Sequence, residues 1–405
     1  MQNKQDKLPL STYLLSLAQT INLTMAVLSV SIGAVVGIKL APSIKLSTVP
    51  YGIQFLMVML FSYLASSLMK KKGRAFTFYL ACIFLFCAGI MGYLAVIKHN
   101  FIFMCIAHAL LGIYISCANF YRFAATDNLS NNLKSKAISF VIFGGVLAGI
   151  LGPFLAQNLK NLAGYIEFSL CYGIMSVFAL LNILVIFIWQ RMQSNVQKQN
   201  ITPHNIKHNN HELAVDDVKF SLPIIISAVI TSSIGYLVMN LIMIQSSLVM
   251  KNMCSFSESS TAIQAHVLAM FLPSFITGKL INKFGVWTIT HLSFLLLALS
   301  SLWGIYFLDY NSVFIELIIL GLGWNFGYVA GSSLLTLGTP EAIKHKVQGI
   351  NDSLIAFSAT IGAFSPSFLY ISLGWKSTHI LITAICIIVF VANLFIHHKV
   401  KKNHF

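Results

Sequence analysis

Charged side chains are scarce in this chain, and acidic ones most of all. Its 405 residues include 26 Lys and Arg but 11 Asp and Glu, and the four types together make up 9% of the sequence. A soluble domain of ordinary composition has roughly 25% charged residues, because its surface must face water. With 57% hydrophobic residues, this chain cannot cover a water-facing surface of its size. Most of it is therefore expected to lie in lipid.

The sequence also lacks the motifs of soluble catalysis and of metal binding. It has no CxxC pair among its seven cysteines, no HExxH and no glycine-rich loop of the kind that holds phosphate. We expect no enzymatic activity, no cofactor and no bound metal. The sequence also shows no nucleotide site, so we expect that any energy-requiring step of this membrane protein is driven by an ion gradient.

The net charge of +15 does not indicate nucleic-acid binding. Lys and Arg occur in short clusters between apolar runs of about 20 residues, the length of helix that spans ~30 Å of hydrocarbon. A nucleic-acid surface would gather the charge on one folded face. The positive charge therefore indicates membrane topology.

Twelve apolar segments recur along the chain, each long enough to cross a bilayer as a helix. They cover residues 12–38, 49–69, 75–97, 101–123, 137–158, 166–190, 220–248, 260–281, 287–308, 313–337, 351–373 and 377–398. The segments predict an all-α integral membrane protein with twelve transmembrane helices. The lipid bilayer is its first expected partner.

The distribution of Lys and Arg between the segments predicts the orientation. If the amino terminus is cytoplasmic, the basic residues on the outer side are Lys39, Lys45, Lys98, Lys160, Lys251 and Lys376. The other 20 of the 26 then lie on the cytoplasmic side, as the positive-inside rule requires. We expect a multi-pass protein of a bacterial inner membrane with both termini in the cytoplasm.

A polar stretch divides the chain into two halves. Residues 1–190 form the expected amino-terminal six-helix half, residues 191–219 a cytoplasmic linker, and residues 220–405 the carboxy-terminal half. The loop LMKKKGR (68–74) has a counterpart in LINKFGV (280–286), and KSKAIS has one in KHKVQG at a nearly equal offset. Matched loops at a constant offset indicate a duplicated unit and an interface between two halves.

The repeated loops carry a recognisable pattern. Residues 278–286, GKLINKFGV, resemble the loop signature G-x-L-a-D-[RK]-x-G-[RK] of the major facilitator superfamily, with Gly285 as its second glycine. The loop after the second segment resembles it in Gly73 and Arg74. Asn282 replaces the acidic residue of the signature and a lysine replaces it in the first loop, so the gating salt bridge that the resemblance implies lacks its carboxylate.

A second motif lies in the fifth segment. Gly152 and Pro153 end the run GGVLAGILGP, which is similar to a glycine–proline motif often found in exchangers of the superfamily. Small residues let helices approach closely and proline bends them. The resemblance covers nearly the whole chain. It implies a secondary transporter that works by alternating access, with helices 1, 4, 7 and 10 around a central cavity.

Long polar side chains occur on these four helices. They are Asn22, His108, Tyr236, Asn240, Asn325 and Tyr328. A polar group inside a membrane needs a partner, water or a ligand, so we interpret these six as candidates for substrate binding. Packing of helix against helix is the alternative interpretation.

Ionisable groups in the segments are the candidates for coupling and gating. His108 resembles in position an arginine that the family resemblance links to proton coupling, and histidine titrates near physiological pH. A neutral, hydrogen-bonded histidine is the alternative, and His266 is the second candidate. Arg122 and Asp127 are expected to form a gate ion pair or a loop anchor. Glu316 is expected to reach the membrane interface, which leaves no carboxylate near the midplane.

The function expected from these features is secondary active transport of a small polar or anionic solute, driven by a proton gradient. A loose resemblance favours a siderophore or a related carboxylate metabolite. A multidrug or metabolite exporter of the same superfamily is the alternative, given 31 phenylalanines. A membrane sensor or membrane enzyme would need an added soluble domain or a metal-ligand cluster. The expected partners are the solute, the bilayer and a proton, and the expected state is a monomer.

Overall fold

The computed structural model describes residues 8–43, 46, 49–127, 129–199, 220–250 and 253–402. The regular structure in this part of the chain is all helical, and it contains no β-strand. The α-helices are α1 (Leu10–Leu40), α2 (Val49–Lys72), α3 (Arg74–Ile97), α4 (Phe101–Ala118), α5 (Tyr121–Ala124), α6 (Asn131–Phe143), α7 (Gly145–Leu159), α8 (Ser169–Gln199), α9 (Leu222–Met250), α10 (Phe256–Phe271), α11 (Ser274–Phe284), α12 (Val286–Tyr306), α13 (Tyr310–Gly338) and α14 (Lys344–Lys402). A short 3-10 helix, η3 (Glu341–Ile343), precedes α14.

Twelve membrane-crossing segments follow from these helices. Eleven spans in the described residues are long and apolar enough to cross a membrane. Residues 344–402 make up α14, in which Gly374, with a φ of 76°, separates two successive helices. Its two parts, before and after Gly374, cover the last two predicted segments. The predicted all-α membrane fold is therefore confirmed.

Two predicted segments are each divided into two helices of at least 11 residues. Helix α6 gives way to α7 at Gly144, and α10 gives way to α11 at Pro273. Proline has no N–H to donate to the preceding turn, so the break between α10 and α11 follows directly from the sequence. These breaks lie in the two segments that meet across the interface between the halves.

Glycine makes the sharp turns in the two repeated loops. Gly73 separates α2 from α3 with a φ of 87°, and Gly285 separates α11 from α12 with a φ of 86°. A Cβ added at either position would meet nothing within 4 Å. The backbone conformation therefore selects glycine here, because a side chain is strained at positive φ. The same turn in both loops is what a duplicated unit predicts.

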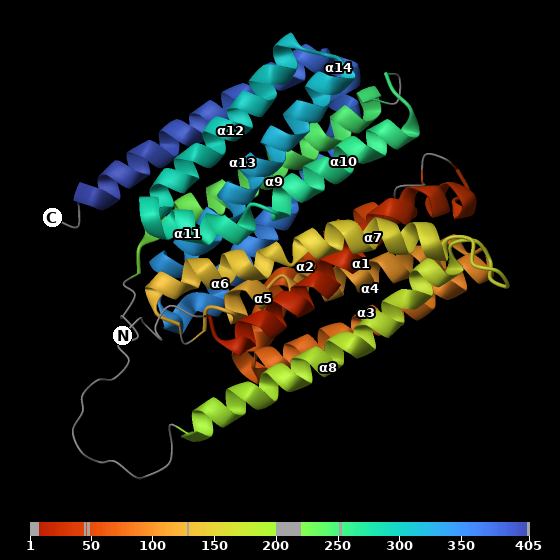
Figure 1. The fold of residues 1–405 in the computed structure, drawn as a ribbon, viewed down its shortest axis with the longest axis horizontal. Coiled ribbons are helices and arrows are strands. Elements are labelled where there is room, and N and C mark those ends of the chain that lie inside the picture. Colours follow the sequence, from red (N-terminus) through yellow and green to blue (C-terminus); the bar gives the residue numbers. More distant parts are fainter. Residues whose placement is uncertain are drawn as a thin grey trace.

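The helices form two bundles (Figure 1). Helices α1 to α8 form one, which we call the N-half, and α9 to α14 form the other, the C-half. The start of α1 and the end of α14 lie at the same end of the molecule. Helix α8 continues to Gln199, beyond the predicted boundary at residue 190. The rest of the predicted linker, residues 200–219, lies outside the described residues.

We call the end that holds the start of α1 and the end of α14 the basic end. The last turn of α2 there carries Lys70, Lys71 and Lys72, and the last turn of α14 carries Lys399, Lys401 and Lys402. In Figure 1 the two bundles meet at this end, where α6 lies beside α11, and diverge towards the other end. Helix α2 packs along α14 as the second contact between the halves.

Candidate functional site

The halves touch backbone to backbone at the basic end. The Ser139 hydroxyl on α6 donates to the carbonyl of Ser274 on α11, and it accepts a hydrogen bond of 3.0 Å from the Gly278 amide. A Cβ on Gly278 would lie 2.8 Å from the Cα atom of Lys136 and 2.8 Å from the carbonyl oxygen of Ser135. This contact is possible because residue 278 has no side chain. We call it the α6–α11 contact.

A second contact closes the same end between α2 and α14. The Ser66 hydroxyl donates to the His345 carbonyl. A Cβ on Gly349 would lie 2.7 Å from the Ser66 Cβ atom and 3.2 Å from the Tyr63 Cα atom. The two contacts together close the basic end in this structure, and we call them the basic-end gate.

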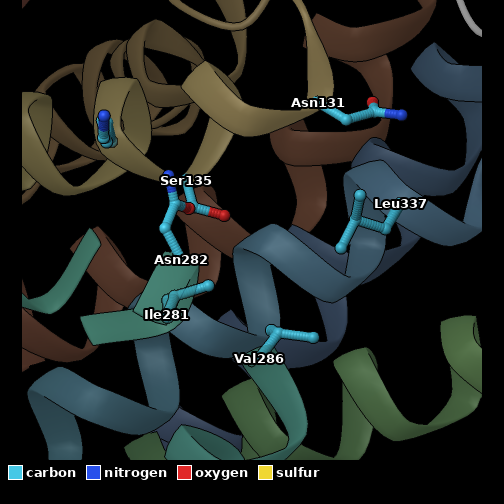
Figure 2. A pocket seen from close by; sticks show the side chains of 7 residues that line it. Asn131, Ser135, Ile281, Asn282, Val286 and Leu337 are labelled. Atoms are coloured by element: carbon cyan, nitrogen blue, oxygen red, sulfur yellow. The ribbon is translucent and has the colours of Figure 1, made fainter. Parts of the chain in front are cut away.

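A pocket of about 440 Å³ lies beside the α6–α11 contact, between α6, α11, α12 and α13. Figure 2 shows Ser135 of α6 and Asn282 of α11 at its wall, with Asn131 and Leu337 on its other side. Asn282 is the residue that replaces the acid of the loop signature. The pocket thus lies where the signature's carboxylate would be, and an amide lines it instead.

Asp127 supplies a carboxylate to the gate from the turn after α5. It accepts hydrogen bonds from Arg74 at 2.6 Å (Nε) and 3.0 Å (Nη2), and from Lys344 Nζ at 3.1 Å. Burial by itself would raise the pKa of Asp127, but the charges and hydrogen bonds of Arg74 and Lys344 outweigh burial and hold it below its usual value. Because Arg74 belongs to the N-half and Lys344 to the C-half, the aspartate links the halves.

The predicted pairing of Arg122 with Asp127 is wrong. The Arg122 guanidinium donates to Asp352 Oδ1 on α14 at 2.6 Å, to Ser332 Oγ on α13 at 3.2 Å and to the Asn119 carbonyl at 2.6 Å. Arg122 is 1% exposed and Asp352 is 4% exposed. The two come from different halves, so this ion pair is a buried bridge across the interface.

Three aromatic rings of the C-half lie directly beside this ion pair. The Trp324 and Tyr328 rings of α13 stack with centroids 4.9 Å apart, and Tyr236 of α9 meets both edge-on at 5.1 and 5.3 Å. The Arg122 guanidinium lies 4.8 Å from the Tyr328 ring centroid. Trp324 and Tyr328 are buried and Tyr236 is half-buried. We call Tyr236, Trp324 and Tyr328 the aromatic cluster.

Comparison with known proteins identifies the family. A model described as Major Facilitator Superfamily matches residues 225–404. The riboflavin transporter RfnT of Brucella anthropi is 30% identical over 379 residues, which cover 93% of this chain and 93% of that protein. This chain belongs to the major facilitator superfamily. It is a membrane transporter and not an enzyme.

Two further kinds of relative agree with this placement. An uncharacterized MFS-type transporter of Bacillus subtilis, YdeG, is 29% identical over 60% of this chain and 58% of its own length. The human organic anion transporter MFSD10 has a TM-score of 0.75 at 12% identity, covering 97% of this chain and 100% of that one. A bacterial homologue of the iron transporter ferroportin has a TM-score of 0.71 at 13% identity, covering 96% and 99%. These two structures show the superfamily fold.

The six predicted substrate-binding residues do not form one cluster. Tyr236 and Tyr328 meet in the aromatic cluster, but His108 lies inside the N-half. Its Nδ1 is 2.9 Å from Gln54 Oε1 and its Nε2 is 3.1 Å from the Tyr172 hydroxyl. A neutral ring that donates through Nδ1 and accepts through Nε2 satisfies both contacts. A proton role for His108 stays a prediction.

The three predicted asparagines all have protein partners. The Asn325 amide donates to the Met270 carbonyl at 2.6 Å and accepts from the Thr277 hydroxyl at 2.7 Å. Asn240 donates to the Ala359 carbonyl at 3.1 Å, and Asn22 to Gln19 at 3.3 Å within α1. This geometry matches the packing interpretation of these side chains. Their place in substrate binding stays a prediction.

The remaining gating candidates lie at contacts between helices. His266 Nδ1 donates to the Leu317 carbonyl on α13 at 2.7 Å. A Cβ on Gly152 would lie 2.6 Å from Val27 Cγ1, so α7 packs tightly on α1 next to Pro153. Arg74 begins α3 at the gate and binds Asp127 as described.

Glu316 does not reach the membrane interface, contrary to expectation. It is fully buried, and its Oε1 lies 2.8 Å from His379 Nε2 on α14. His379 Nδ1 lies 2.9 Å from the Trp375 carbonyl, so Nδ1 carries a proton. One further proton is then shared in the bond between His379 Nε2 and Glu316. The prediction failed because residues 63 positions apart in sequence are brought together by α13 and α14.

Proposed function

We propose that this transporter moves a small, planar, aromatic solute of the flavin class across the membrane. Two findings support the substrate class. The first is 30% identity to a riboflavin transporter along nearly the full length of both chains. The second is the aromatic cluster beside Arg122. The cluster is the observation that carries the proposal.

The chemistry of the cluster fits a flat heteroaromatic ring system. Aromatic rings prefer offset-stacked and edge-on neighbours at 4.5–7 Å between centroids, and the cluster already has both arrangements. Tyr236 is half-buried, not fully buried like the other two rings, so it gives a solute an edge of the cluster to contact. The Arg122 guanidinium uses three of its five N–H groups for Ser332, Asn119 and Asp352, so the other two can donate to the carbonyl oxygens at the polar edge of a flavin while its charge stays paired.

An anionic carboxylate solute fits the site less well. Such a solute needs a cation that is free to bind it. Among the described residues the buried cationic side chains are Arg74 and Arg122, and each is paired with an aspartate. We therefore do not propose a siderophore or other polycarboxylate as the solute.

Alternating access between the halves supplies the mechanism. In alternating access the central site opens first to one side of the membrane and then to the other. The closed basic-end gate belongs to the state in which the basic end is shut, and opening that end would require the α6–α11 and α2–α14 contacts to separate. The concentration of Lys at this end favours a cytoplasmic position for it. We propose accordingly that the gate faces the cytoplasm of a bacterial cell and that both termini lie on that side.

Binding of riboflavin to the purified protein tests the substrate class. Riboflavin fluorescence is quenched when its ring stacks on Trp or Tyr, so we expect saturable quenching by the parent protein. Trp324→Ala removes the stacked ring, and we expect it to weaken binding at least about tenfold, or ~1.4 kcal/mol. Trp303→Ala is the matched control, because Trp303 contacts Phe307 outside the cluster. Equal quenching by both variants would place the solute elsewhere. Displacement by many unrelated drugs would favour the multidrug alternative.

A further inference from the structure

A group of acceptor oxygens without donors lies next to the buried ion pair on α14. Gln348 Oε1, Asn351 Oδ1 and Asp352 Oδ2 are buried, and none accepts a hydrogen bond from a described residue. The residues are spaced three and four apart, so they share one face of the helix. Buried acceptor oxygens normally receive a hydrogen bond. The three on this face of α14 receive none, so an added proton would have a place to bind.

Asp352 is the member of the group that can take up this proton. Its Oδ1 already accepts from Arg122 at 2.6 Å and from Asn351 Nδ2 at 2.8 Å. Its Oδ2 is free. A proton on Oδ2 would neutralise the carboxylate and convert an orphan acceptor into a donor for its neighbours.

The position of the ion pair links this proton to the gate. Arg122 is on the N-half and Asp352 on the C-half, so the pair must separate when the halves part at the basic end. A buried charge left without its partner is strongly unfavourable. Protonation of Asp352 before separation removes its charge and so lowers the barrier to opening.

The position of the pair also links the proton to the solute. Arg122 lies against Tyr328 of the aromatic cluster. Once Asp352 and Arg122 separate, the Arg122 guanidinium has lost its charged partner. A solute that binds this guanidinium can then take the place of Asp352. We propose that Asp352 is the binding site of the coupling proton, and that its protonation releases Arg122 and allows the basic-end gate to open. This inference rests on the proposed alternating access between the halves, but not on the identity of the solute.

Other ionisable groups near Asp352 are few and identifiable. Arg122 faces it from the N-half, and Tyr328 and Tyr236 face it from α13 and α9. His345 lies seven residues before Asp352, about two turns along α14, and Asp127 binds the adjacent Lys344. A proton is favoured over a metal cation because the single free oxygen Asp352 Oδ2 is enough to bind it, whereas no group of three or more His, Cys, Asp or Glu side chains lies together among the described residues.

The gate itself gives a readout that needs no solute. Spin labels on Lys71→Cys and Lys346→Cys, in a background without the native cysteines, would report the distance between the last turn of α2 and the first turn of α14. Both lysines are exposed and lie in different halves. In the parent, we expect the ratio of open to closed gate to rise as pH falls, by up to about tenfold per pH unit, the limit for one proton.

Three variants decide the assignment. Asp352→Asn mimics the protonated carboxyl group, so we expect it to hold a raised open fraction that no longer changes with pH. Asp352→Glu keeps a carboxylate and should keep the pH dependence with a shifted midpoint. Glu167→Gln, an exposed carboxylate paired with lysines, is the control and should follow the parent.

Each result supports or overturns the proposal. A gate without pH dependence in the parent overturns it, as does an Asp352→Asn protein that follows the parent. A pH dependence removed by Asp127→Asn instead would assign the proton to the loop. Opening by added NaCl at constant pH and ionic strength would assign the site to sodium. Riboflavin binding is measured separately, so its failure would reject the substrate and leave the gate result intact.

Discussion

Gly278→Ala should open the basic-end gate, because the α6–α11 contact leaves no room for a methyl group. The added Cβ would lie 2.8 Å from both the Lys136 Cα atom and the Ser135 carbonyl oxygen. Both are backbone atoms, which cannot rotate away as the end of a side chain can. The helices must therefore separate by a good part of 1 Å, and the hydrogen bond from the Gly278 amide to Ser139 would weaken with them.

The size of the effect follows from overpacking. Inserting a methylene into a packed contact typically costs about 1–3 kcal/mol, and ~1.4 kcal/mol is a tenfold change in an equilibrium. The closed-to-open ratio should thus fall roughly 5- to 150-fold. The folded state as a whole should lose less, because each half keeps its own core.

The assay is the distance between labels at positions 71 and 346, measured with Gly278→Ala and with a control. Gly173→Ala is the control, since its Cβ would meet only Tyr93 Cδ2 at 3.4 Å within the N-half. An increased open fraction in Gly278→Ala alone agrees with the argument. Equal closed fractions in both variants would show that the α6–α11 contact does not hold the gate.

Three further predictions concern charge and topology. Asp127→Asn should also raise the ratio of open to closed gate, by about tenfold or more, because hydrogen bonds to charged groups are worth about 1.5–3 kcal/mol. Since the pKa of Asp127 is lowered in the closed state, the contribution of Asp127 is fully present above its unperturbed pKa and is lost as pH falls through the lowered value, so titrating the gate distance below about pH 4 checks the sign. Glu316→Ala should reduce the unfolding free energy by about 1–3 kcal/mol, because it leaves His379 Nε2 buried without a hydrogen-bond partner. A thermal melt in detergent measures this, and a melting temperature equal to that of the parent would contradict it. A reporter active only in the periplasm should work when fused after Lys98 and fail when fused after Lys402; activity at Lys402 would invert the proposed orientation.

The membrane fold was predictable from the sequence because it depends on local features. A run of about 20 apolar residues specifies a spanning helix on its own, and glycines 73 and 285 specify tight turns within their own loops. The boundary between the last two segments was visible as well, because Gly374, with a φ of 76°, turns the chain between residues 373 and 377. The break at Pro273 was visible in the sequence but was not used.

The partners of the charged residues could not be predicted. Arg122 pairs with Asp352, 230 positions away, whereas the sequence suggested its neighbour Asp127. Only the packing of the N-half against the C-half brings Arg122 to Asp352. Asn325 shows the same limit, because its amide finds Thr277 and Met270 through the contact of α13 with α10 and α11. Polar residues at helical spacing therefore predicted burial without distinguishing packing from ligand binding.

Counterflow of labelled riboflavin tests the central claim most directly. The purified protein would be placed in liposomes loaded with unlabelled riboflavin at equal pH on both sides, and the transient entry of the labelled compound would be followed. We predict entry well above that of empty liposomes, and a rate reduced about tenfold or more by Trp324→Ala but not by Trp303→Ala. Entry equal to that of empty liposomes, from a protein that is folded by its thermal melt, would contradict flavin transport.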